Sequence, residues 1–451
     1  MYIGSLSLTE EVVIAENSVV NVPYLKLSAE NSIGLETNSL LKGDGTGSEV
    51  IFNTPDGDFQ MASGSSITDF ETVQIIAESA RLDGDLTSSE GTLVISTDNL
   101  VLTPEEYMET DSDTFYFLTG TWAGFSGFDN LELNADTSLT LAGGTNINVN
   151  TTLIMDTPAI LSEEVGGLTD VGITAGKIYL VNTTGEDESV SHPDATIGSL
   201  VLTARETFGI GHGDIYLGGF NDINMASSNN GVLGDVLLRG EGSLITDGDL
   251  TFTAKRVISS YYEDSDIDYE SPEFLVHAGN TLDYRAISIV GNGSTTDNYS
   301  ASSYGGTLDF VGKTIQLDGS GIGATCGWVT LTAYGEDTDG ESITLSNNAF
   351  IDVSGNSYAA GGRAILSAGV DAGDIVIGAD SFIDVSAGSQ GDAGILKLLA
   401  PGGDVVVDGG IYGSAQNGGT GGAFYMDIHQ LAETDTSSLL DILRNEGFDY
   451  R

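Results

Sequence analysis

Apolar and polar residues alternate along most of this 451-residue chain, in short runs bounded by Gly, Asn, Asp, Ser and Thr. Clear runs are Leu93–Ser96, Leu131–Asn134, Ile178–Val181 and Val329–Thr332. A period of two places successive side chains on opposite faces of a β-strand, and the bounding residues favour turns. The pattern therefore predicts an almost entirely β protein built from many short strands.

A repeat is visible in the last third of the chain. Ile343–Ser354 and Ile375–Ser386 share the block Phe-Ile-Asp-Val-Ser, 32 positions apart. A looser third copy follows at Val405–Val407 and Ile411–Ser414. Self-similarity at this period predicts a solenoid, in which each unit is too small to bury its own apolar face and stacks on its neighbours.

Each repeat holds about three short strands, for example Ile343–Ser346, Phe350–Ser354 and Arg363–Ser367. Three strands per unit favour a parallel β-helix over leucine-rich repeats or propeller blades, which need a different frame or longer units. In such a stack Asp352 would lie about 5 Å from Asp384. Like charges at that spacing repel, so we expect the pair to recruit a cation or to keep one carboxyl pKa raised.

The regularity of the pattern divides the chain into three parts. Residues 1–304 are expected to form irregular β-helix coils with insertions, and residues 305–430 regular coils of about 30 residues. Residues 431–451 are predicted to be a short helical tail or a continuation into a longer protein, because Thr434–Arg444 clusters its apolar residues at helical spacing. The expected insertions lie at 104–120, 157–172, 183–196 and 260–274.

The charge balance is extreme, with 14 Lys and Arg against 67 Asp and Glu and a formal net charge of −53. Such a surface repels phosphate backbones and anionic lipid, so we predict no nucleic-acid partner, and it disfavours polyanionic substrates. It suits solubility, and it suits work in salt-rich or divalent-rich water where counterions relieve self-repulsion. No apolar run reaches the ~18 residues of a membrane span, so we expect no membrane insertion.

No residue is assigned as catalytic, cofactor-binding or metal-binding. Two acidic runs offer oxygen ligands for Ca²⁺ without the spacing of an EF-hand: Asp264, Asp266, Asp268 and Glu270, and then Asp337, Asp339 and Glu341. Solvated loops are favoured for both runs, so no cofactor is expected and weak Ca²⁺ binding stays open. The histidines stand apart from one another and from any zinc partner: His192, His212, His277 and His429. Cys326 is the only cysteine, and we favour a role as a packed side chain over a role as a catalytic nucleophile.

Several segments carry a family resemblance. Strand entries of the Gly-Asp-Ile type such as Gly373–Ile375, the blocks Phe350–Gly355 and Phe382–Ala387, and the line Gly248–Lys255 resemble the filamentous haemagglutinin family. These are large exoproteins that Gram-negative bacteria export by two-partner secretion. The resemblance, best from Gly211 to Met426, implies a right-handed parallel β-helix within a secreted or cell-surface adhesin. The family's Asn-Pro-Asn-Leu and Asn-Pro-Asn-Gly motifs are absent from the sequence, so we expect a fragment from the shaft.

The repeat pattern predicts a non-enzymatic shaft segment, and the resemblance implies that it belongs to a large extracellular adhesin of a Gram-negative bacterium. The expected partners are a host or neighbouring-cell surface or its glycans, an outer-membrane secretion partner, and further copies of the chain by lateral or end-to-end association. Tyr261, Tyr262 and Tyr269 could bind sugar faces, although covering a sheet edge is favoured for them. Two alternatives stay open: a polysaccharide-processing β-helix enzyme, which needs facing carboxylates in a groove, and the stalk of a contact-dependent toxin.

Overall fold

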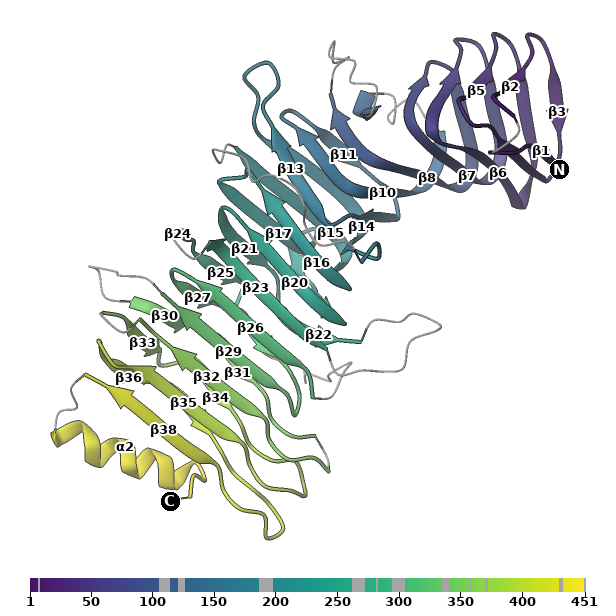
Figure 1. Ribbon diagram of the computed structural model, residues 1–451. Helices are drawn as coiled ribbons and strands as arrows, with labels where there is room; N and C mark the ends of the chain where they lie inside the picture. Colours follow the sequence, from purple (N-terminus) through teal and green to yellow (C-terminus); the bar gives the residue numbers. More distant parts are fainter. Residues whose placement is uncertain are drawn as a thin grey trace. The chain divides into compact units, whose positions relative to one another are not determined.

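The computed structural model describes residues 1–6, 9–104, 114–120, 126–185, 198–261, 272–280, 283–293, 305–334, 341–356, 358–369, 372–429 and 433–449. The chain forms two compact units, each described by itself (Figure 1). Unit 1 is Met1–Thr203 with Ile215–Phe220, and unit 2 is Ala204–Asp214 with Asn221–Arg451. In both units strands of successive coils pair in parallel, which confirms the predicted all-β parallel β-helix.

Unit 1 is built from three columns of parallel strands. The first column contains β1 (Tyr2–Gly4), β4 (Tyr24–Ser28), β12 (Thr152–Asp156) and segments of β6 (Leu40–Met61), β7 (Ser66–Leu82), β8 (Asp85–Thr103), β10 (Ser126–Ala142) and β14 (Val171–Val181). The second column adds β2 (Glu11–Ile14), β5 (Ser32–Leu35), β9 (Phe115–Leu118), β13 (Ala159–Glu163) and the part of β16 (Gly213–Gly218) that begins at Ile215. The third column adds β3 (Val19–Asn21) and β11 (Asn146–Asn148).

The strands β6, β7 and β8 are longer than the sequence pattern predicts. Each runs through more than one column, and the corners appear as register shifts, for example between Lys42 and Gly45 and between Thr54 and Asp58. Bulges of this kind bend a strand without ending it. Alternation alone marked only the straight segments, because a bulge breaks the period of two.

A ladder of apolar side chains fills the first column of unit 1. Leu27, Phe52, Ile75, Ile95 and Leu133 are register partners in consecutive paired strands, and all are fully buried. Each coil therefore buries its inward face against the coils on either side, as a solenoid requires.

Unit 2 also has three columns, named A, B and C. Column A contains part of β15 (Ser199–Ile210), then β19 (Asp235–Arg239), β22 (Arg256–Ser260), β28 (Gly321–Gly323), β31 (Phe350–Asp352), β34 (Phe382–Asp384) and β37 (Gly410–Tyr412). Column B contains β20 (Glu241–Thr246), β23 (Glu273–Asn280), β26 (Thr307–Gly312), β29 (Trp328–Ala333), β32 (Arg363–Ser367), β35 (Ile395–Ala400) and β38 (Ala423–Ile428). Column C contains β17 (Asp222–Asn229), β21 (Asp249–Thr253), β25 (Ile287–Val290), β27 (Ile315–Asp318), β30 (Glu341–Ser346), β33 (Asp374–Ile377) and β36 (Val405–Val407).

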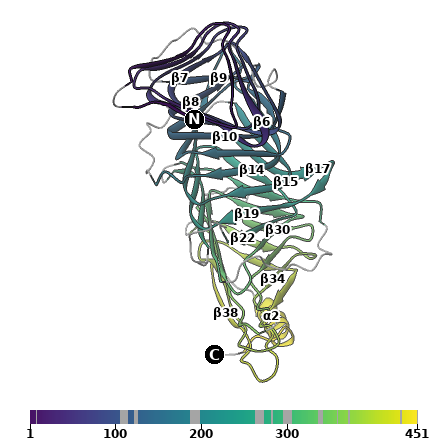
Figure 2. The same ribbon diagram turned by 90° about the vertical axis from the view of Figure 1, so that its right-hand side faces the viewer.

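The structure confirms the predicted repeat residue by residue. Ile343 pairs with Ile375 in column C, and Phe350 pairs with Phe382 in column A. The looser third copy takes its place too, since Ile375 pairs with Val405 and Ile383 with Ile411. Figure 2 shows the coils of unit 2 stacked from β19 to β38.

Two short strands depart from the parallel pattern. The strands β18 (Val232–Leu233) and β24 (Asp283–Tyr284) form antiparallel hairpins with β17 and β23, respectively.

A helix, α2 (Glu433–Asn445), follows β38 and confirms the helix predicted within Thr434–Arg444. Leu443 of the helix is buried, and so is Phe448 beyond it. Phe448 forms a parallel bridge with Gly422 and an edge-on ring contact with Phe424, with centroids 5.9 Å apart. The helix and the residues after it thus pack on the last coil of unit 2.

The predicted insertion at 157–172 is wrong. It contains β13, whose Ile160 pairs with Leu139 of β10 and so belongs to a regular column. The insertion at 104–120 is only partly described, and its Phe115–Leu118 is the strand β9. Most of the insertions predicted at 183–196 and 260–274 lie outside the described residues.

Candidate functional site

The stacked aspartates predicted from the repeat are register partners in β31 and β34. Asp352 accepts a hydrogen bond from the backbone N–H of Ser354 at 2.9 Å, and Asp384 accepts one from that of Ser386 at 2.8 Å. Burial raises the pKa of Asp384, with repulsion by Asp352 as a smaller contribution. The expected raised pKa is therefore confirmed at Asp384, but its main cause is burial rather than charge repulsion.

Aromatic rings follow the same column beside the aspartates. The rings of Phe350 and Phe382 stack with centroids 5.5 Å apart, and Tyr412 lies 5.9 Å from Phe382 in the next coil. Tyr412 is also the register partner of Asp384, so the acidic row ends there. Across the described residues no three His, Cys, Asp or Glu side chains gather closely enough to hold a metal ion. We assign this column a structural role.

Unit 1 has a concavity of about 470 Å³ on the outward face of β2, β5, β6 and β7. The register places Gly34 between Val13 and Gln60, and the missing side chain leaves a hollow between these two neighbours. The charged residues that line the concavity are Glu11, Glu36, Arg81 and Asp83.

The carboxylates of this concavity are mostly engaged in local structure. Glu36 accepts a hydrogen bond from the backbone N–H of Glu16 at 2.8 Å, and Asp83 accepts one from Nε of Arg81 at 2.6 Å. None of the described residues that line the hollow is aromatic. A glycosidase needs two carboxyl groups that both face the scissile bond, so this arrangement gives the enzyme alternative little support.

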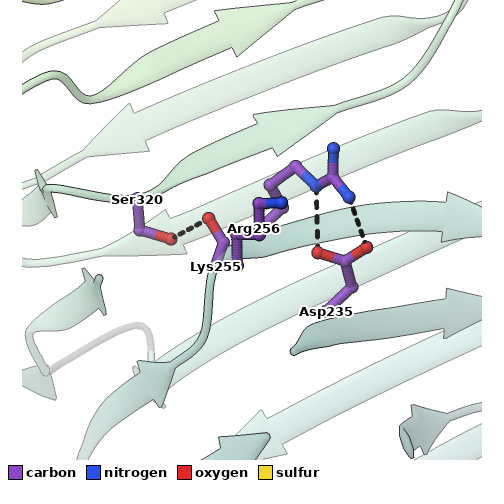
Figure 3. A network of polar contacts seen from close by, with 4 residues as sticks. All are labelled: Asp235, Lys255, Arg256 and Ser320. Atoms are coloured by element: carbon purple, nitrogen blue, oxygen red, sulfur yellow. Dashed lines mark hydrogen bonds and ion pairs between the residues drawn. The ribbon is translucent and has the colours of Figure 1, made fainter. Parts of the chain in front are cut away.

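A shielded ion pair joins two coils in column A of unit 2 (Figure 3). Arg256 donates from Nε and Nη2 to the two carboxylate oxygens of Asp235, at 2.9 and 2.7 Å. The two side chains are only 13% and 24% exposed, respectively. Ser320 donates to the carbonyl oxygens of Ala254 and Lys255 at 2.8 and 3.1 Å.

This network lies where column A makes its longest jump in sequence. No described strand of column A lies between β22 and β28, and Arg256 pairs directly with Gly321. The ion pair fixes β22 on β19, while the Ser320 hydroxyl fixes the entry to β28. The ion pair thus joins two consecutive coils, and the Ser320 contact holds together the strands on either side of the long intervening chain.

The outward face of column B carries two cation–aromatic pairs that the sequence analysis missed. The Arg363 guanidinium carbon lies 4.4 Å from the ring centroid of Trp328, and Lys397 Nζ lies 5.3 Å from that of Tyr425. Each pair is a direct register pair on adjacent strands. The 32-residue repeat predicts that Arg363 lies beside Ile395 on the following strand, as it does. Coil lengths vary, so the repeat does not predict that Trp328 lies beside Arg363 or that Tyr425 lies beside Lys397.

Single residues noted in the sequence occupy separate places. The ring of His277 lies 5.7 Å from that of Tyr284, and burial lowers the pKa of this histidine, which favours neutral imidazole. Cys326 is half-buried, and burial raises the pKa of its thiol, which opposes the thiolate that a nucleophile needs. The following lie outside the described residues: His192, the Asp264–Glu270 run, Tyr262, Tyr269, Asp337 and Asp339.

Comparison with known proteins finds no match to this chain among family models, curated proteins or solved structures. Within the described residues no helix has the length and apolar character needed to cross a membrane. Functional inference therefore rests on the coil architecture and on the chemistry of its surfaces.

Proposed function

We propose that this chain is a non-enzymatic structural segment of a large exoprotein, extracellular or on the surface of a Gram-negative bacterium. One observation carries the proposal. Apolar side chains stack in register from coil to coil, as in the Leu27, Phe52 and Ile75 ladder of unit 1 and the Ile315, Ile343 and Ile375 ladder of unit 2. Coils that share a core in this way resist separation, which suits a segment that holds a binding or toxic domain away from the cell.

The surface chemistry supports the same proposal. A net charge of −53 keeps a long β-rich protein soluble and suits ion-rich surroundings, with weak Ca²⁺ binding as a way to relieve self-repulsion. The resemblance of Phe350–Gly355 and Gly248–Lys255 to filamentous haemagglutinin segments supports export through an outer-membrane partner. The expected contacts of the whole protein are then a host or neighbouring-cell surface or its glycans.

The experiment that tests the location uses the bacterium that encodes the chain. An antibody to residues 305–430 is used to detect the protein on intact cells and in the medium, before and after deletion of each candidate gene for an outer-membrane transporter of the two-partner type. We expect surface and released signal in the parent, loss of both in one deletion strain, and removal of the surface signal by added protease. A protein that stays inside the cell in every strain contradicts the proposal.

A second experiment separates the structural proposal from the enzyme alternative. The intact protein is incubated with neutral polysaccharides, and reducing ends are measured over time. We expect no turnover. Turnover that disappears in the Glu11→Gln or Asp83→Asn variants would establish the concavity of unit 1 as an active site and overturn the proposal.

A further inference from the structure

Arg363 and Lys397 are the cations of the two cation–aromatic pairs on column B. Within the described residues neither side chain lies within ion-pair distance of a carboxylate. Some cations of the chain do pair, as Arg256 pairs with Asp235 and Arg285 with Asp283. Among the described residues Lys26, Lys177 and Lys313 have no ion pair either, so Arg363 and Lys397 are distinguished by the exposed aromatic ring that each contacts.

The register places these two cations on neighbouring strands. Arg363 of β32 pairs with Ile395 of β35, and Lys397 pairs with Ile365, so the cations occupy one diagonal of a square and the isoleucines the other. Their charged groups lie toward opposite sides of this strand pair, the Arg363 guanidinium over Trp328 of β29 and Lys397 Nζ over Tyr425 of β38. The face therefore carries two separate positive charges, and each can attract an acidic group of a partner surface.

The aromatic residues extend this arrangement over four strands. Trp328 lies beside Arg363 on β29, and Tyr425 lies beside Lys397 on β38. The two aromatic residues are 51% and 53% exposed, respectively. Exposed Trp, Tyr and Arg are the residues that most often dominate binding at protein–protein interfaces.

The charge of this face differs from that of the chain. The charged residues in β29, β32, β35 and β38 are Arg363, Lys397 and Asp427, so the strands carry more positive than negative charge. At physiological ionic strength, charges separated by more than about 8 Å are largely screened. The local charge of this face therefore governs close contact, even in a molecule of net charge −53.

We propose that the outward face of β29, β32, β35 and β38 binds an acidic surface of a second copy of this chain. The inference rests on the proposed structural function, because it supplies the lateral contact between neighbouring molecules. The chain supplies complementary carboxylates, since it has 67 Asp and Glu residues. The cationic face of one molecule would contact an acidic surface on a different part of the next molecule. A contact of that kind can repeat from molecule to molecule. With four strands about 4.8 Å apart, the face is small for a stable interface, so the association is concentration-dependent.

Sedimentation velocity of the intact protein tests the proposal, from 1 to 200 μM in 150 mM NaCl. The test variant is Arg363→Glu with Lys397→Glu. The matched control is Lys42→Glu with Arg81→Glu, which changes the net charge equally at exposed positions of unit 1. We expect reversible dimers or larger species in the parent and in the control, and at least tenfold weaker association in the test variant. Trp328→Ala with Tyr425→Ala, which leaves the charge unchanged, should also weaken association.

Three outcomes overturn the proposal. They are a parent that stays monomeric at 200 μM, an equal loss in the test and control variants, and an Arg363 and Lys397 variant that associates as the parent does. Circular dichroism of each variant confirms that the strands are intact. If the parent stays monomeric and binds a carboxylate-bearing saccharide through Arg363, the face serves a glycan instead. Failure here leaves surface location and lack of turnover untouched, since those are measured separately.

Discussion

Unit 1 and the last third of unit 2 build the same kind of coil with different corners. In the early coils of unit 1, hydrogen bonds between successive coils join residues 20 to 24 positions apart, as between Glu16 and Glu36. Near the end of unit 2 the separations are 28 to 30, as between Ser414 and Ser386. The additional residues lie in the corners, because the paired strand segments are similarly short in both regions.

This difference shows that the columns of strands define the fold, whereas the corners define the coil length. In unit 1 some corners are tight turns, as at Asn17 and Asn38, and others are bulges inside long strands such as β6. In the last third of unit 2 the corners are turns between separate short strands. Asn347 and Asn348, for example, both adopt positive φ just before β31. Asn tolerates that conformation better than most residues. A coil of the unit 2 type should therefore be removable as a whole.

Removal of one complete coil tests whether the coil is the stacking unit of unit 2, and its control, removal of a single strand, has the largest expected effect. Deletion of Gly355–Ser386 removes β32, β33 and β34 together, so β35 would stack on β29 and β37 on β31 with the register kept. We expect a folded protein whose thermal midpoint changes by a few degrees, since each coil contacts only its neighbours.

The control deletes Gly355–Ala368, which removes β32 alone and leaves a coil without its column B strand. Leu331 and Leu398 would then lose the partner that lies between them. We expect loss of the cooperative thermal transition, seen by circular dichroism, and loss of amide protection after residue 328. If the whole-coil deletion is as damaging as this one, the coil is not the stacking unit.

Matched truncations of single core residues compare how tightly the two units pack their apolar ladders. Ile75 in unit 1 and Ile343 in unit 2 are both fully buried at the centre of an apolar ladder. Replacing either by Ala should lower the free energy of unfolding by about 2–5 kcal/mol, from lost burial and the remaining cavity. Urea unfolding measures the free energy of unfolding of both variants, and amide hydrogen exchange shows which coils lose protection. A much smaller cost at Ile75 would mean that short coils pack their core less tightly than long ones.

The comparison also explains how much could be predicted from the sequence. Alternation and the Phe-Ile-Asp-Val-Ser repeat were sufficient for the parallel β-helix, for the pairing of Phe350 with Phe382, and for the helix α2. They failed where corners are irregular. The segment 157–172 was predicted as an insertion, although β13 lies within it, because its strand follows a bulge-rich coil without a repeat to align it.

The surface sites were harder to predict than the fold. The pairing of Trp328 with Arg363 depends on the length of one particular coil, and so does the pairing of Arg256 with Asp235. The sequence gives no independent measure of that length. Stacked aspartates were predictable because they belong to the repeat itself, whereas the dominance of burial at Asp384 depends on neighbouring side chains.

A shielded and an exposed ion pair provide the third test. Arg256→Ala leaves Asp235 partly buried without its partner, and we expect a loss of about 1–3 kcal/mol in the free energy of unfolding. The matched change in unit 1 is Arg81→Ala, where Arg81 is 74% exposed in its pair with Asp83, and it should cost less than about 1 kcal/mol. Chemical denaturation of both variants decides the matter. Equal losses would show that shielding from solvent does not make the Arg256–Asp235 pair more stabilising than the exposed Arg81–Asp83 pair.

The smallest effect expected is at Asp384. Its raised pKa means that the folded state holds a proton more tightly than the unfolded state does, so stability falls as pH rises from the ordinary Asp pKa through the raised value. Asp384→Asn keeps an oxygen that can accept the hydrogen bond from the Ser386 N–H and removes the charge. Its gain over the parent should be absent near pH 3 and reach at most about 1 kcal/mol near neutral pH. Urea midpoints of the variant and the parent are measured at several pH values, and a gain at Asp384 that persists at pH 3 would mean that burial of the charge is not what destabilises this coil.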